Sequence, residues 1–336
     1  MAESTPGTTA WHDLVQEEIL DPDRPIVDPH HHLWEKQSMW GIYTLEDLWK
    51  DTGSGHNIEK TVFIDCHSSY RTEGPDHLKP IGETEYVAAA AARSAADTDK
   101  ATIAAIVSHA NMLLAERVEE VLAAHEAAGN GLFRGIRHAG PHDTSGTLRN
   151  PGPPRPCPYD LPDFRTGVRT LGRLGYTYDT WHFYLQNQDY LALARACPET
   201  TMILDHFGTP LGVGAYANRQ GEIFDQWKAD VAEIAQCPNV VAKLGGMAMP
   251  DNGFGWHERS TPPTSDEFVE AQKPWFFHMI QCFGPDRCMF ESNYPVDRLS
   301  VSYHVLWNAF KKLTSGFTED EKDAMFHGTA TRVYRL

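Results

Sequence analysis

The stretch Ile26-Val27-Asp28-Pro29-His30-His31-His32 joins a short apolar run to a group of histidines. Seven more short runs rich in β-branched or apolar residues follow it along the chain. The eight candidate strands are residues 26–32, 60–66, 101–109, 132–138, 176–184, 201–206, 239–245 and 287–292. Apolar residues recur at helical spacing between them, as at Leu114, Val118, Val121 and Leu122. Strands that alternate with helices predict an α/β protein with a parallel sheet.

Eight strand–helix units can close into a barrel, and an open doubly wound sheet is the alternative. An open sheet normally has a glycine-rich phosphate-binding turn after its first strand, and no Gly-x-Gly-x-x-Gly follows residues 26–32. A length of 336 residues suits one large barrel or two medium domains. We therefore expect a single (β/α)8 TIM barrel over residues 25–336, preceded by an N-terminal extension over residues 1–24.

Two long loops follow the fourth and seventh candidate strands. One covers residues 140–162 and contains seven prolines, and the other covers residues 246–265. Loops at the carboxyl ends of barrel strands form the active-site face, so these segments are candidate covers for a substrate. Ordinary solvated loops are the alternative.

Composition and charge exclude several classes of partner. A formal net charge of −17 without a basic patch argues against nucleic acid and anionic membranes as partners. The first residues show no basic segment before an apolar run, so a cytoplasmic protein is expected. Six scattered cysteines without a Cys-x-x-Cys motif favour free thiols over disulfides or a thiolate zinc site. The N-terminal extension could close the bottom of the barrel or contact a partner subunit, which leaves a homo-oligomer open.

Histidines at two strand ends predict a metal site. Side chains two apart on a strand share a face, so His30 and His32 should point together into the barrel mouth. A pair of neutral imidazoles suits a zinc-like divalent ion, and a histidine cluster in a polar loop is the alternative. His206 ends the sixth candidate strand just before a glycine turn, which brings a third imidazole to the same level.

Other polar groups recur at strand ends, where packing alone does not explain them. They are Asp65 and His67, His109 and Asn111, Arg137 and His138, and His182 and Gln186. For His67, His109 and His182 taken singly, a structural role in the core is the alternative.

Six motifs together resemble one known family. They are Asp28-Pro29-His30-His31-His32-Leu33-Trp34, Thr61-Val62-Phe63-Ile64-Asp65-Cys66, Gly82-Glu83-Thr84-Glu85-Tyr86-Val87, Arg134-Gly135-Ile136-Arg137-His138, Asp205-His206-Phe207-Gly208 and Glu291-Ser292-Asn293-Tyr294-Pro295-Val296-Asp297. The pattern resembles the amidohydrolase 2 branch of the amidohydrolase superfamily, metal-dependent TIM-barrel hydrolases that include lactonases of pyrone-dicarboxylate, sugar acids and sulfomuconolactone. It covers the chain from about Pro25 onward and does not specify a substrate.

The resemblance implies a single-metal site that the chain matches except at one position. The family pairs the His-x-His motif and the sixth-strand histidine with an aspartate of the eighth strand, and that position here is Asn293. An asparagine can bind a metal through its carbonyl, but it cannot accept a proton as a general base. Asp297, four residues later, is our candidate replacement, and a helix cap is its alternative role.

We therefore expect a hydrolase that opens a lactone or ester ring of a small anionic substrate. A zinc-like ion on His30, His32 and His206 would activate a water, and Asp297 would take its proton. Arg137 would pair with a substrate carboxylate, because a guanidinium matches that group bidentately. The remaining candidate substrate-binding residues are His109, His138, Tyr184 and Gln186.

Three alternatives stay open. Some relatives work without a metal, with the same histidines and an arginine that polarises the carbonyl directly. A non-oxidative decarboxylase of an aromatic or muconate-type acid is a second enzymatic reading. A non-catalytic binding paralogue that has lost its base is the third, and Asn293 is its only support.

Overall fold

Eight parallel strands form the centre of the computed structural model, which describes residues 5–153 and 155–336. Neighbouring strands in the sheet follow one another along the chain. The strands are β1 (Ile26–His31), β4 (Ile58–Ile64), β5 (Thr102–Ser108), β6 (Phe133–Arg137), β7 (Thr177–Thr180), β8 (Met202–Leu204), β9 (Val240–Leu244) and β10 (Cys288–Phe290). All eight candidate strands of the sequence are therefore confirmed, although β7, β8 and β10 are clearly shorter than expected.

The sheet closes through contacts just beyond β10. His31 forms an isolated parallel bridge with Tyr294. The backbone N–H of His32 donates to the Tyr294 carbonyl at 2.8 Å, and the N–H of Asn293 donates to the His30 carbonyl at 3.1 Å. These bonds bring the first and eighth strands together, so the sheet is a nearly closed barrel, and the expected (β/α)8 architecture is confirmed.

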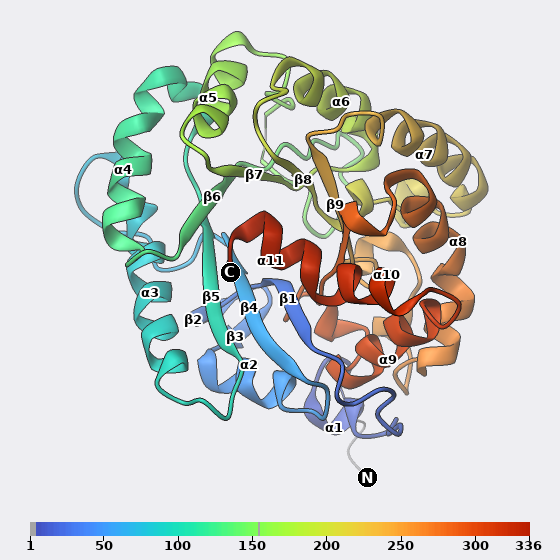
Figure 1. Cartoon of the computed structure of the whole chain (residues 1–336). Helices are drawn as coiled ribbons and strands as arrows, with labels where there is room; N and C mark the ends of the chain where they lie inside the picture. The colour runs from blue at the N-terminus through green and yellow to red at the C-terminus, as the bar shows by residue number, and fades with distance from the viewer. Residues whose placement is uncertain (1–4, 154) are drawn as a thin grey trace.

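Helices surround the barrel, as Figure 1 shows. The longer ones bury an apolar stripe against the strands, which is what the helical spacing of their apolar residues predicts. They are α2 (Leu45–Thr52), α3 (Ile81–Ala95), α4 (Val118–Ala128), α5 (Pro162–Arg173), α6 (Asn187–Ala196), α7 (Gln220–Ile234), α8 (Ser265–Phe283) and α9 (Tyr303–Leu313). Helix α8 begins with a capping box, in which Thr264 and Glu267 bond each other's backbone N–H.

The amino-terminal end of the barrel is closed by α11 (Thr329–Tyr334), which follows the short helix α10 (Glu319–Asp323). Helix α11 lies across the middle of the barrel in Figure 1. Its residues Ala330, Val333 and Tyr334 pack with inward-facing residues of the strands in a separate interior cluster. A packed end of this kind leaves the opposite, carboxyl end of the strands as the open face.

The N-terminal segment lies against the side of the barrel. A single helical turn, α1 (Thr9–His12), precedes an irregular stretch. The indole of Trp11 donates to the Arg259 carbonyl at 3.0 Å, and Lys311 donates to the Leu20 carbonyl at 2.9 Å. This segment therefore covers α9 and the loops that follow β9 and β10.

Three insertions lie at the carboxyl ends of the strands. A hairpin of β2 (Trp34–Ser38) and β3 (Gly41–Tyr43) follows β1. The residues between β6 and α5 form a long loop, and those between β9 and α8 form short helical turns at Pro250–Asn252 and Trp256–Glu258. None of the helices in the described ranges has the length and apolar character needed to cross a lipid bilayer.

Candidate active site

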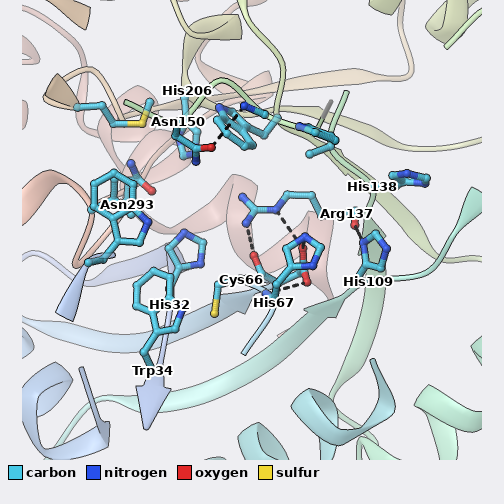
Figure 2. Close-up of a pocket in the computed structure, with 18 of the residues that line it drawn as sticks. His32, Trp34, Cys66, His67, His109, Arg137, His138, Asn150, His206 and Asn293 are labelled. Carbon is cyan, nitrogen blue, oxygen red and sulfur yellow. Dashed lines mark hydrogen bonds and ion pairs between the residues drawn. The ribbon is translucent and has the colours of Figure 1, made fainter. Parts of the chain in front are cut away.

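A cavity of about 400 Å³ opens at the carboxyl ends of the strands. Residues from the β2–β3 hairpin, the long loop after β6 and several strand ends line it, as Figure 2 shows. Imidazoles and indoles dominate its wall: His32, His67, His109, His138, His206, Trp34, Trp40 and Trp181. Such a pocket at this face of a barrel is the expected position of an active site.

His30 and His32 point toward each other, as their spacing on β1 predicts. Their Nε2 atoms lie 3.2 Å apart, and both side chains are buried. The Nδ1 of His32 bonds the Ile64 carbonyl at 2.8 Å, so this nitrogen carries the ring proton and Nε2 keeps its lone pair. Burial lowers the pKa of both imidazoles well below 6.5, which keeps them neutral.

His206 lies beside this pair, with its ring centroid 4.5 Å from that of His30. Its Nδ1 donates to Oε1 of Glu291 at 2.7 Å, which leaves Nε2 as a lone-pair donor. The backbone of His206 has a φ of 53°, an uncommon conformation for a residue other than glycine. Gly246 allows this placement, because a Cβ there would lie 2.2 Å from Nδ1 of His206.

A cluster of buried charged residues lies inside the barrel next to the histidines. Lys243 on β9 lies 2.9 Å from Asp179, 3.1 Å from Asp205 and 3.9 Å from Glu291. Three carboxyl groups thus share one ammonium group. Both oxygens of Asp205 are buried without a hydrogen-bond partner among the described residues. Burial raises the pKa of Asp205 to about 6 and that of Glu291 to about 8. The negative charge of the three carboxylates is therefore only partly balanced by Lys243, and a bound cation would stabilise them.

Arg137 ends β6 and reaches across the pocket toward these groups. Its Nη2 donates to the Asp65 carbonyl. Its Nε lies 3.8 Å from the Asp65 carboxylate, and its Nη1 lies 3.7 Å from Asp205 and 3.4 Å from Nε2 of His30. The guanidinium is therefore already surrounded by protein acceptors at the histidine end of the pocket.

Asn293 lines the pocket, and Asp297 lies behind it. The Asn293 amide donates to Oδ1 of Asp297 at 2.9 Å, and the N–H of Ala248 donates to Oδ2 at 3.2 Å. The Oδ1 of Asn293 is buried without a hydrogen-bond partner in the described part of the chain. Burial raises the pKa of Asp297 well above its usual range. Asp297 is not among the residues that line the cavity, so its carboxylate acts on the site only through Asn293.

The remaining predicted residues divide into two groups. His109 and His138 line the cavity, with their ring centroids 5.1 Å apart. Tyr184 and Gln186 do not line it. Gln186 bonds the backbone of His142 instead, and the ring of Tyr184 packs on that of Tyr216.

The donor set fits a divalent metal ion. Two imidazoles bound to one zinc ion at about 2.0–2.1 Å have nitrogens roughly 3.3 Å apart, close to the separation of His30 and His32. One ligating atom from each of His30, His206 and Glu291 lies within 4.8 Å of the others, and His32 is outside this group but contacts His30 at 3.2 Å. Carboxylates behind metal-binding histidines are the usual supporting arrangement, and an ion here would meet the charge demand of the buried acids.

Sequence reasoning missed Lys243, Asp179 and the supporting role of Glu291. One signal was present, because Lys243 interrupts the otherwise apolar run Val240–Leu244, all of which is buried. A lysine inside such a strand needs a carboxylate partner nearby. Arg155, Trp40 and Asn150 were also missed, because irregular loops carry no periodicity that assigns a direction to a side chain.

Comparisons with known proteins agree with this architecture. A family model described as amidohydrolase matches residues 27–336. An uncharacterized protein of Sinorhizobium fredii is 32% identical, over 94% of this chain and 99% of its own. An L-fucono-1,5-lactonase of Burkholderia multivorans is 27% identical, over 92% and 96%. A Burkholderia multivorans amidohydrolase solved with bound zinc is 24% identical, with a TM-score of 0.70 over 93% of this chain and 99% of its own. These matches confirm the resemblance seen in the motifs: the chain belongs to the amidohydrolase family and is a hydrolase.

Proposed function

We propose that this hydrolase opens the lactone or ester ring of a small carboxylated substrate. One observation carries the proposal: His32 and His206 line the pocket, buried His30 lies against both, and the Nδ1 bonds of His32 and His206 leave a lone pair on each Nε2. Neutral imidazoles in this arrangement are ligands for zinc, and amidohydrolase relatives named as lactonases agree with the reaction class.

A divalent ion held by His30, His32 and His206 would polarise the substrate carbonyl and lower the pKa of a water bound beside it. The buried carboxylate of Glu291 fixes His206 through the 2.7 Å bond to Nδ1. Asn293 adds an unpaired carbonyl oxygen at the same end of the pocket, which can bind the ion or orient the water.

The structure suggests roles for Arg137 and Asp297 that differ from those the sequence favours. Arg137 lies 3.4 Å from Nε2 of His30, so we place its guanidinium at the carbonyl that reacts. Asp297 holds the Asn293 amide and thereby positions it. Asp65 is the carboxylate that lines the pocket, which makes it our candidate acceptor for the water proton.

Metal content and a substrate screen test the proposal together. Protein as purified should contain about one zinc-like ion per chain by plasma emission spectroscopy. The His30→Ala and His206→Ala variants should lose it, whereas His327→Ala, which removes a half-exposed histidine of Ala324–Gly328 outside the pocket, should keep it.

The screen should include lactones with and without a carboxylate, together with aromatic acids as decarboxylase substrates. Ring opening that requires the bound ion supports the proposal. Ring opening by protein that binds no metal would support the scheme in which Arg137 polarises the carbonyl. Release of carbon dioxide from an aromatic acid would replace the proposal with the decarboxylase alternative.

A further inference from the structure

The imidazoles of the pocket do not all present the same group to it. His32, His206 and His109 use Nδ1 to donate, the last to the Arg137 carbonyl at 3.1 Å, and each keeps a lone pair on Nε2. His138 is the opposite case. The backbone N–H of Met112 donates to its Nδ1 at 3.1 Å, so the ring proton of neutral His138 must be on Nε2.

The Nε2 atom of His138 contacts the guanidinium of Arg155, from the long loop after β6. A guanidinium has only donors, so two N–H groups face each other here without an acceptor between them. The Nε of Arg155 is buried without a partner, and no carboxylate lies within 4 Å of its guanidinium among residues 5–153 and 155–336. This differs from Arg137, whose guanidinium has carboxylates on both sides.

We propose that Arg155 and His138 form a binding site for a carboxylate. A carboxylate oxygen between them would accept hydrogen bonds from Nε2 of His138 and from the guanidinium. Both donors would then have an acceptor instead of facing each other. Both residues line the cavity, so the anion would be reached from the same space as the imidazoles of His32 and His206.

The two ends of the pocket therefore have opposite character. His138 lies on one side of Figure 2, His32 and Asn293 lie on the other, and Arg137 lies between them. The end at His32 and His206 offers lone pairs to a cation, whereas at the other end Arg155 and His138 offer N–H groups to an anion beside the Nε2 lone pair of His109. The pocket wall also includes the indoles of Trp34, Trp40 and Trp181, which suit a flat ring. Assigning the anion to the substrate's own carboxylate rests on the proposed function, whereas the anion site itself does not.

Benzoate is a suitable probe, because it combines a carboxylate with a flat ring. Calorimetric titration of the whole protein should give binding that weakens about tenfold to a hundredfold in Arg155→Gln, the range for losing hydrogen bonds to a charged group. Arg149→Gln is the matched control, since Arg149 is on the same loop and stacks on the lining residue Trp40 but does not itself line the cavity. Arg149→Gln should bind benzoate as the wild type does.

A second variant tests the histidine. In His138→Asn the amide oxygen can still accept from Met112, but no N–H remains at the position of Nε2. Benzoate affinity should fall in this variant too, and Arg155→Lys should restore only part of the affinity. Absence of benzoate binding to the wild type, or equal affinity in Arg155→Gln and Arg149→Gln, would overturn the anion site.

Kinetics separate this inference from the proposed function. For a carboxylated lactone, Arg155→Gln should raise KM and leave kcat within a few-fold, and for the methyl ester of that lactone it should change neither. Benzoate binding that depends on Arg155 in a protein that opens no lactone would keep the anion site and remove the proposed reaction. Equal effects of Arg155→Gln on the acid and its ester would overturn the carboxylate assignment.

Discussion

Replacing Gly246 by alanine should displace His206, a proposed metal ligand, by about 1.2 Å. A Cβ at this position would lie 2.2 Å from Nδ1 of His206 and 2.5 Å from its Cγ. Ordinary contact begins at 3.4 Å, so the imidazole must move by 3.4 − 2.2, about 1.2 Å. The bond from Nδ1 to Glu291 is 2.7 Å long, and a movement of that size breaks it.

The expected consequence is a loss of metal affinity and of catalysis. Losing the carboxylate behind a metal-binding histidine weakens metal binding by about 10–100-fold. Misplacing a ligand by about 1 Å lowers catalytic efficiency by roughly 100-fold. Zinc affinity is measured by competition with a chelating dye, and kcat/KM with the best lactone from the screen.

Gly255→Ala is a closely matched control. Gly255 has a φ of 69°, against 70° for Gly246, but no atom lies within 4 Å of a Cβ built there. Both variants put alanine into the left-handed region, at a cost of about 1–2 kcal/mol in folding stability. Both unfolding temperatures should therefore fall, that of Gly246→Ala further because the His206–Glu291 bond is also lost, and only Gly246→Ala should lose zinc. Equal zinc affinity and equal kcat/KM in the two variants would refute this account of His206.

Three further results are expected. Lys243→Met should destabilise the ion-free protein by about 3–5 kcal/mol at pH 8, because it leaves buried carboxylates unpaired. Burial raises the pKa of Asp205 to about 6, and losing Lys243 raises it further, so this destabilisation should shrink in urea unfolding at pH 5, where the carboxyl is protonated. Asp65→Asn should lower kcat by at least about 100-fold, because it removes the proposed base, whereas Asp297→Asn should lower kcat by less than about tenfold. A larger loss of kcat in Asp297→Asn than in Asp65→Asn would restore Asp297 as the base. Without metal, Asn293→Asp should unfold at a lower temperature than the wild type, because the new carboxylate lies beside that of Asp297. With zinc the variant should unfold at a higher temperature than the wild type. A lower unfolding temperature in both conditions would exclude residue 293 as a ligand.

The barrel could be predicted because its signals are local. Each strand is a short apolar run between amphipathic segments, and the eight runs predict eight parallel strands in chain order. The extent of β7 was overestimated, because residues 181–184 continue its apolar pattern after the backbone has left the sheet for the turn at Tyr184–Gln186. Periodicity marks which residues are buried but not where a ladder of hydrogen bonds ends.

The site could be predicted only in part, because the sequence seldom indicates where a side chain outside a strand or helix points. His30 and His32 are two apart on a strand, so the sequence alone indicates that they share a face. Gln186 lies in a short 3-10 turn that directs its side chain to the His142 backbone, which no repeat in the sequence encodes. Asp297 was expected to return to the pocket, but the structure directs its carboxylate to the Asn293 amide and the Ala248 N–H behind the pocket wall.

Helix α11 completes the hydrogen bonding of the buried acids, and it is synthesised after all eight strands. The hydroxyl of Tyr334 donates to Asp179 at 2.6 Å, and Asp179 in turn pairs with Lys243 beneath the histidines. A ribosome releases all eight strands before it releases Tyr334, so a nascent barrel has an incompletely paired charge at its centre. Until α11 docks, the strand residues at the amino-terminal end of the barrel also lack the packing of Ala330 and Val333.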